Sequence, residues 1–199
     1  MSVREVAAQA YREALPALAT SVVGGLFAGV VLGGMRAELR AVPGLLVLVP
    51  ALLATRGNVY GSLGARLSTG LHQGLVEPAF DSAFDSALNL DDRVTAAVAA
   101  ALGNGILASL FASVVAFLVL QLLGEPVAPL ATLLAIALVA GLLSGVALTV
   151  AVVSVVFAGF RRGYNPDTLV GPLVTTTGDV FGISFLLLAV RFVLALGGA

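Results

Sequence analysis

Residues 94–124 read VTAAVAAALGNGILASLFASVVAFLVLQLLG and contain no Asp, Glu, Lys or Arg. At about 1.5 Å of rise per residue, a helix of this length exceeds the roughly 30 Å hydrocarbon layer of a membrane. The next stretch, residues 126–160, is equally free of charge and is long enough to span with some tilt. Glu125, Pro126 and Pro129 separate the two stretches. This pattern predicts two transmembrane helices joined by a short turn.

The composition of the whole chain agrees with a membrane location. Of 199 residues, 59% are hydrophobic and 11% are charged, whereas charged residues make up about a quarter of a typical soluble domain. The net charge of −1 and the absence of a basic run argue against nucleic-acid binding. With no Cys and a single His72, the chain offers no thiolate and no multi-His metal site of its own. We therefore expect a membrane protein that is not an enzyme, since an intramembrane hydrolase would lack its catalytic groups.

Three further apolar stretches complete a five-span architecture. Residues 14–35 are uncharged and predict span one. Residues 43–71 predict span two, which we expect to be broken or kinked at the glycine-containing segment 57–61. A proline at a helix start opens span five, predicted for residues 165–196. The fold class is thus an all-α, polytopic membrane protein, with residues 1–199 forming one transmembrane domain.

The distribution of Arg residues predicts the orientation. Five spans place the two termini on opposite sides, and positive residues favour the cytoplasm. An N-terminus inside would put Arg4, Arg12, Arg93, Arg161 and Arg162 in the cytoplasm and Arg36 and Arg40 outside. We therefore expect a multi-pass protein of the plasma membrane with a cytoplasmic N-terminus.

Asp179 is the residue most informative about function. It lies about ten residues, or 15 Å, beyond the expected entry of span five, which places it near the middle of the membrane. A charge there costs at least ~2.5–3.5 kcal/mol, so the carboxylate should face a cavity, a partner or an ion. In a helix Thr175 and Thr176 share its face, and Pro172 leaves room for backbone or water. Few carboxylates with other oxygen ligands suit a hydrated Mg²⁺.

One carboxylate makes a weak site, and the sequence leaves several interpretations open. In a twofold homodimer, two copies of Asp179 would meet at the axis around one dication. Alternatively Arg56, at a similar depth in span two, forms a structural ion pair with Asp179, or acts as a gate or tethered counter-charge that the cation displaces. Asn58, beside Gly57, either turns an oxygen toward the path or serves packing alone. Glycines spaced by four residues predict either a dimer seam or packing within the chain: Gly25, Gly29 and Gly33, Gly141 and Gly145, and Gly178 and Gly182.

Residues 73–93 form an acidic connection, predicted to lie in the cytoplasm. Its candidate cation-attracting acids are Asp81, Asp85, Asp91 and Asp92. One interpretation is an interfacial amphipathic helix, and another is an acidic vestibule or cation sensor. At the inner mouth of span five lie Asp167 and Asn165, and the latter could instead cap the helix.

Two segments resemble the MgtE-type magnesium transporter family, in its membrane domain, and the related animal solute carriers. They are residues 50–69, PALLATRGNVYGSLGARLST, and residues 165–179, NPDTLVGPLVTTTGD. The resemblance implies a homodimer of ten spans, a path lined by spans two and five, and a divalent cation held near the twofold axis by Asp179. Bacterial members begin the second segment with Asp-Pro where this chain has Asn165-Pro166, and they carry a small residue where Arg56 stands. The positive charge of Arg56 argues against free channel-like flow.

The combined interpretation is a homodimeric transporter of Mg²⁺ or other divalent cations embedded in lipid. The metal ligands expected are Asp179, Thr175, Thr176, Asn58 and Asp167; the path or gate residues expected are Arg56, Gly57, Pro172 and Asn165. The N-terminal segment is too short for the soluble sensing module of bacterial members, so regulation would need a separate chain. The alternative is a non-transporting membrane subunit that assembles with a soluble partner, recognisable by an Asp179 that is always paired with Arg56.

Overall fold

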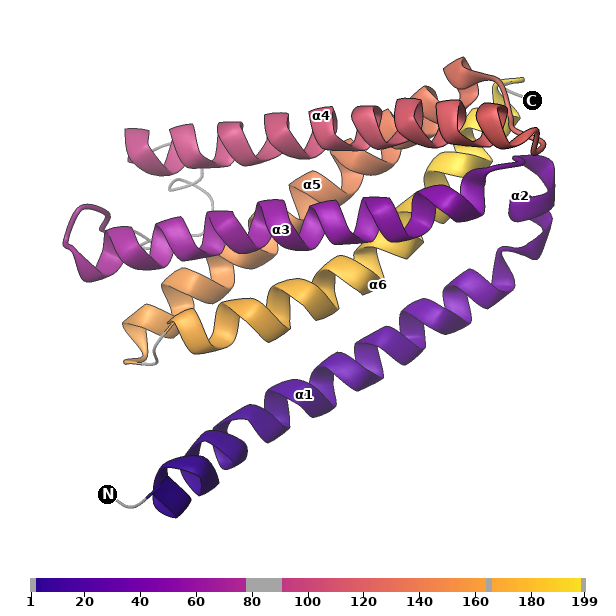
Figure 1. The fold of residues 1–199 in the computed structure, drawn as a ribbon. Coiled ribbons are helices and arrows are strands. Elements are labelled where there is room, and N and C mark those ends of the chain that lie inside the picture. Colours follow the sequence, from indigo (N-terminus) through magenta and orange to yellow (C-terminus); the bar gives the residue numbers. More distant parts are fainter. Residues whose placement is uncertain (1–2, 78–90, 164–165, 198–199) are drawn as a thin grey trace.

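The computed structural model describes residues 3–77, 91–163 and 166–197, and the secondary structure in these ranges is entirely helical. The five long helices of these ranges run back and forth along one bundle. The two termini lie at opposite ends of it (Figure 1). A short helix joins the first two of the long helices. The bounds are α1 Val3–Gly34, α2 Arg36–Ala41, α3 Leu45–His72, α4 Asp92–Leu123, α5 Leu130–Arg161 and α6 Pro166–Ala195.

Four helices in the described ranges are long and apolar enough to cross a membrane. They are α3, α4, α5 and the Val174–Ala195 part of α6. The apolar portion of α1, Leu18–Gly34, is shorter. The prediction of an all-α polytopic membrane protein is therefore confirmed, while the fifth span stays a prediction.

The predicted break in span two is wrong, because α3 is a continuous helix through segment 57–61. Each backbone group left unbonded in lipid costs several kcal/mol, whereas a glycine in a helix costs about 1 kcal/mol, so the unbroken helix is favoured. Burial of one face adds to this, since seven side chains of that face are nearly inaccessible: Leu45, Leu48, Leu52, Tyr60, Leu63, Leu67 and Leu71. No backbone carbonyl is therefore freed beside Asn58.

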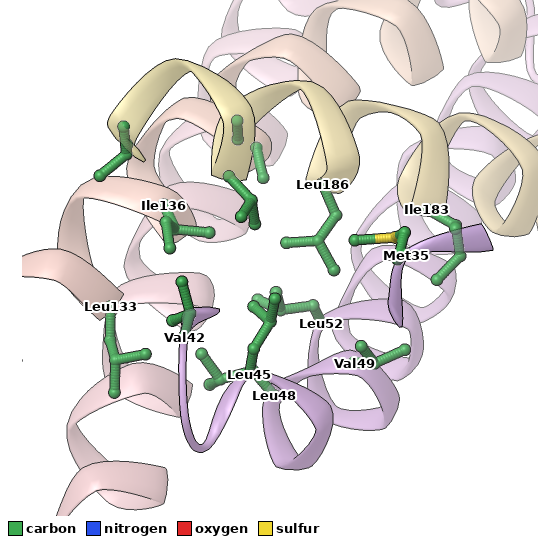
Figure 2. Packing of buried hydrophobic residues seen from close by; sticks show 14 of the residues in the cluster. Met35, Val42, Leu45, Leu48, Val49, Leu52, Leu133, Ile136, Ile183 and Leu186 are labelled. Carbon is green, nitrogen blue, oxygen red and sulfur yellow. The ribbon is translucent and has the colours of Figure 1, made fainter. Parts of the chain in front are cut away.

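Two apolar clusters hold the bundle together, one toward each end. The first surrounds α2 and the start of α3, where Met35, Leu48 and Leu52 pack against α5 and α6 (Figure 2). The second packs Tyr60 and the rest of α3 against α4 and α5, with Phe157 among its buried members. Each cluster packs the helices together at its own end of the bundle.

A layer of small and polar residues separates these clusters at the middle of the bundle. Arg56 lies between the two clusters along α3, as Ser144 does along α5 and Asp179 does along α6. Two buried serines of α4 donate to their own helix, Ser109 to Gly105 O at 2.8 Å and Ser113 to Ser109 O at 3.0 Å, and Ser113 also lies 3.4 Å from Leu133 O of α5. The polar residues of α3 and α6 thus share one depth, and the site lies there.

Candidate functional site

Asp179 lies near the middle of α6, 13 residues after its first residue and 16 before its last. At 1.5 Å per residue this is about 20 Å from the near end, close to half the thickness of a membrane with its headgroups. The side chain is partly exposed, and no hydrogen bond or ion pair to it is formed within the described residues. α6 therefore carries an unpaired acid at mid-bundle.

The two threonines before Asp179 have their hydroxyl hydrogens directed to their own helix. Thr175 Oγ1 donates to Gly171 O, and Thr176 Oγ1 donates to Pro172 O, each at 2.8 Å. The remaining lone pairs of both oxygens can still accept or ligate. Thr175 is exposed, so its oxygen is accessible from outside the bundle, whereas Thr176 is only partly so.

Thr176 also contacts α1. Its Oγ1 lies 3.0 Å from Ser21 Oγ, and because the Thr176 hydrogen goes to Pro172, the Ser21 hydroxyl is the donor. A methyl group at Gly24 would collide with Thr176 Cγ2, so the glycine permits this close approach of α1 to α6. α1 thus covers the side of α6 that carries Thr176 and, one turn further along, Asp179.

Arg56 approaches α6 from α3 and is almost fully buried, with 3% of its surface exposed. None of its three guanidinium nitrogens has a hydrogen-bond partner among the described residues. The Nη1 atom lies beside Gly182, where an added Cβ would be 2.8 Å from it. Gly182 is three residues after Asp179, so the guanidinium lies one helical turn from the acid without bonding to it.

Asn58 is exposed at mid-length of α3 and lines a pocket of about 290 Å³. The other polar residues of that pocket are Ser62, Arg66 and, from α4, Asn104. Gly57 is partly exposed, and a Cβ there would touch nothing. The polar face of α3 thus opens away from the buried Arg56.

The residues expected at the inner mouth are only partly described. Asp167 lies in the first turn of α6, where the backbone alone is described, and Pro172 is a partly exposed residue one to two turns further on.

The acidic connection is also described only in part. Asp91 caps α4 by accepting a hydrogen bond from Arg93 N at 2.8 Å, and Asp92 is exposed in the first turn of α4. Asn165, Asp81 and Asp85 lie outside the described residues.

Within the ranges that the structure describes, no group of three or more His, Cys, Asp or Glu side chains is close enough to hold a metal ion. What one chain presents at mid-bundle is a single carboxylate with neighbouring hydroxyl oxygens. Such a set could bind a cation that keeps much of its water, or share one with a second copy.

Two neighbours of the site were not expected from the sequence. Ser21 reaches Thr176 across 155 residues, and Asn104 lines the same pocket as Asn58. Asn104 lies between two glycines in an uncharged stretch, which is a signal that could have drawn attention to it. Ser21 gave no such signal, because serine is common in membrane helices.

A model of the MgtE family, described as a divalent cation transporter, matches residues 49–189. The matched range covers most of the chain and includes both Arg56 and Asp179, while α1 lies before it. No match was found among curated proteins or among solved structures.

Proposed function

The chain belongs to the MgtE family of divalent cation transporters and is not an enzyme, and from this premise we propose that it moves Mg²⁺ across the plasma membrane with Asp179 as the central ligand. The observation that carries the proposal is the position of Asp179: mid-helix, partly exposed, and without a partner among the described residues. A carboxylate at this depth needs a counter-charge, and a visiting dication supplies one.

The chemistry of the surrounding groups favours a hydrated hard cation. Mg²⁺ takes oxygen ligands, gives up water reluctantly, and is bound through one or two carboxylates. Asp179 would supply the charge, and the oxygens of Thr175 and Thr176 would accept hydrogen bonds from metal-bound water. Asn58 would line a different part of the path, in the pocket that α3 forms with α4. Asp167 and Asn165 would form the inner mouth, with Pro172 and Gly57 leaving space for water.

A homodimer would complete the site. Two chains related by a twofold axis would bring two copies of Asp179 to one ion, in a path lined by α3 and α6. The glycine face of α1 supports a second copy: Gly25, Gly29 and Gly33 are exposed, and a Cβ at any of them would touch nothing within the chain. Among the described residues that face makes no close contact, which favours a dimer seam over packing within the chain.

The remaining part of the proposal concerns the orientation of the chain in the membrane. We place the N-terminus in the cytoplasm, with α1 as the fifth span and residues 1–199 acting as one transmembrane domain. Residues 73–93 then form a cytoplasmic connection whose acids attract cations, although Asp91 is already engaged as a helix cap.

The alternative of a non-transporting subunit requires Asp179 to be held by Arg56. Within the described residues Arg56 has no hydrogen-bond partner, so that ion pair is not formed here. Membership of a transporter family also favours transport.

Flux measurements on the purified chain in liposomes would test this proposal. Wild type and Asp179→Asn are compared for entry of Mg²⁺, Mn²⁺ and Ca²⁺, with and without an opposing Na⁺ or H⁺ gradient. Glu125→Gln serves as a matched control, because Glu125 is an exposed acid in the connection between α4 and α5. We expect Mg²⁺ entry in wild type and in the control, and background entry in Asp179→Asn. Undiminished entry in Asp179→Asn would contradict the proposal.

A further inference from the structure

The buried guanidinium of Arg56 has no hydrogen-bond partner within the part of the chain that the structure describes. Gly182 of α6 lies beside its Nη1 atom, and the Tyr60 side chain on α3 is near enough to interact with it electrostatically. All three nitrogens are nevertheless unbonded among the described residues. A charged group in a membrane helix is costly unless it is paired or faces water, and only 3% of this residue is exposed. A partner within reach would therefore be strongly preferred.

Asp179 is the acid that the sequence and the packing place within reach. α3 and α5 contain no acid, and the single acid of α4, Asp92, begins that helix. Positions three apart on a helix have Cβ atoms about 5–6 Å from each other, so the guanidinium beside Gly182 lies one turn from the Asp179 carboxylate. A change of side-chain rotamers along the long Arg56 side chain would cover that distance without backbone movement.

Gly182 is what makes the present position of Arg56 available. A methyl group there would lie 2.8 Å from Arg56 Nη1 and 2.8 Å from Leu53 Cδ2, which is too close for both atoms. The glycine thus leaves a niche on α6 that holds the guanidinium away from Asp179. The structure shows the side chain in the niche, and the acid one turn away is a second position within its reach.

We propose that Arg56 is a tethered cation that competes with the transported dication for Asp179. When a metal ion occupies the acid, the guanidinium is held in the niche beside Gly182. When the ion leaves, the guanidinium pairs with Asp179 and closes the site. The two bound states exclude each other, so Arg56 sets the apparent affinity of the site for the dication. This inference rests on the proposed role of Asp179 as metal ligand.

The direct test is a double-mutant cycle with Arg56→Gln and Asp179→Asn on the detergent-purified protein, scored by thermal midpoint. Pairing predicts that the two substitutions are coupled in EDTA and that the coupling disappears in saturating Mg²⁺. An Arg56 that remains in the niche predicts equal coupling, or none, in both conditions, and that result would overturn the inference.

The Mg²⁺ affinity, read from the Mg²⁺-dependent thermal shift, gives a second measure. Removing the competitor in Arg56→Gln should tighten apparent Mg²⁺ binding by about 5- to 150-fold, the usual range of coupling between linked sites. Gly182→Ala fills the niche and should have the opposite effect, weakening Mg²⁺ binding. Because Gly182→Ala keeps the charge, it remains informative if Arg56→Gln fails to fold.

These outcomes separate the inference from the proposed function. If Asp179→Asn leaves the Mg²⁺-dependent shift of wild type intact, Asp179 is not the ligand and the proposed function fails with the inference. If that shift depends on Asp179 but Arg56→Gln and Gly182→Ala leave the affinity unchanged, the tethered cation alone is refuted.

Discussion

Arg191 Nε donates a hydrogen bond to Glu38 Oε1 at 2.7 Å, and this ion pair joins the end of α6 to the short helix α2. Glu38 is buried while the Arg191 side chain is 62% exposed. The bond from Arg191 holds the pKa of the Glu38 carboxyl below its usual range, assisted by a backbone hydrogen bond and opposed by burial. The pair fixes the connection that brings α1 and α3 together at one end of the bundle.

The Glu38–Arg191 pair predicts a pH dependence of stability. Because the pKa of Glu38 is lowered in the folded state, its contribution is complete above the unfolded carboxyl pKa of about 4.3. It is lost as the pH falls through the lower folded-state pKa. The thermal midpoint of wild type should therefore drop more steeply between neutral pH and that acidic range than the midpoint of Glu38→Gln. Parallel curves for the two proteins would show that the pair contributes nothing.

Gly24 and Gly25 are neighbours in α1 with opposite surroundings, and they predict opposite effects of alanine. A methyl group at Gly24 would collide with Thr176, whereas a methyl group at Gly25 would touch nothing. Gly24→Ala should cost about 1–3 kcal/mol through overpacking and regain about 1 kcal/mol through helix propensity. The net effect should be a loss of stability. Gly25→Ala should be neutral or stabilising within the chain. Thermal midpoints measure both, and equal midpoints would exclude the α1–α6 contact at Thr176.

The Tyr60 hydroxyl lies between Gly105 of α4 and Gly145 of α5, and this contact predicts a pair of substitutions that compensate each other. A Cβ at Gly145 would be 2.5 Å from Tyr60 Oη but 3.7 Å from Cζ, which is an ordinary contact distance. Gly145→Ala should therefore destabilise by about 1–3 kcal/mol. Adding Tyr60→Phe should restore part of the loss, the remainder reflecting Leu102, whose Cδ2 lies 3.1 Å from the added carbon. Additive losses in the double variant would argue against this packing.

Asn58 and Asn104 line one pocket from two helices, and transport should distinguish them. If Asn58 lines the path, Asn58→Ala removes an oxygen that faces a hydrated cation. Hydrogen bonds to charged groups are worth about 1.5–3 kcal/mol, so Mg²⁺ flux in liposomes should fall by about tenfold or more. Asn104→Ala, the matched control, should leave flux near that of wild type. Equal losses of flux in the two variants would show that both side chains serve packing, or that the ions follow a different path.

The sequence predicted the long helices well, because uncharged stretches bounded by charged or turn residues have few alternatives in lipid. Two such stretches became α4 and α5, and two apolar stretches with few charges became α3 and α6, with ends close to those expected. The prediction of a break near Gly57 was wrong. Glycine and polar residues gather there, but lipid offers the backbone no other hydrogen-bond partners, so the helical hydrogen bonds are kept. The short helix α2 had no clear signal either.

The site was predictable in its residue types and less so in its contacts. The cost of a charge in lipid singled out Asp179 and Arg56 from the sequence alone. Periodicity placed Thr176 beside Asp179, but only the packing of α1 revealed that Ser21 bonds to it. Likewise no sequence rule could tell that Arg56 lies against Gly182 rather than on the acid, because this depends on the side-chain volume available between α3 and α6.

The central claim is that two copies of Asp179 share one dication, and the number of Mg²⁺ ions bound per chain tests it most directly. Equilibrium dialysis measures the Mg²⁺ bound by purified wild type and by Asp179→Asn. The difference between them is the number of ions lost when the acid is removed. Ions held by the acidic connection cancel in that difference. We predict a loss of one Mg²⁺ for every two chains. A loss of one ion per chain, or no loss, would contradict the account.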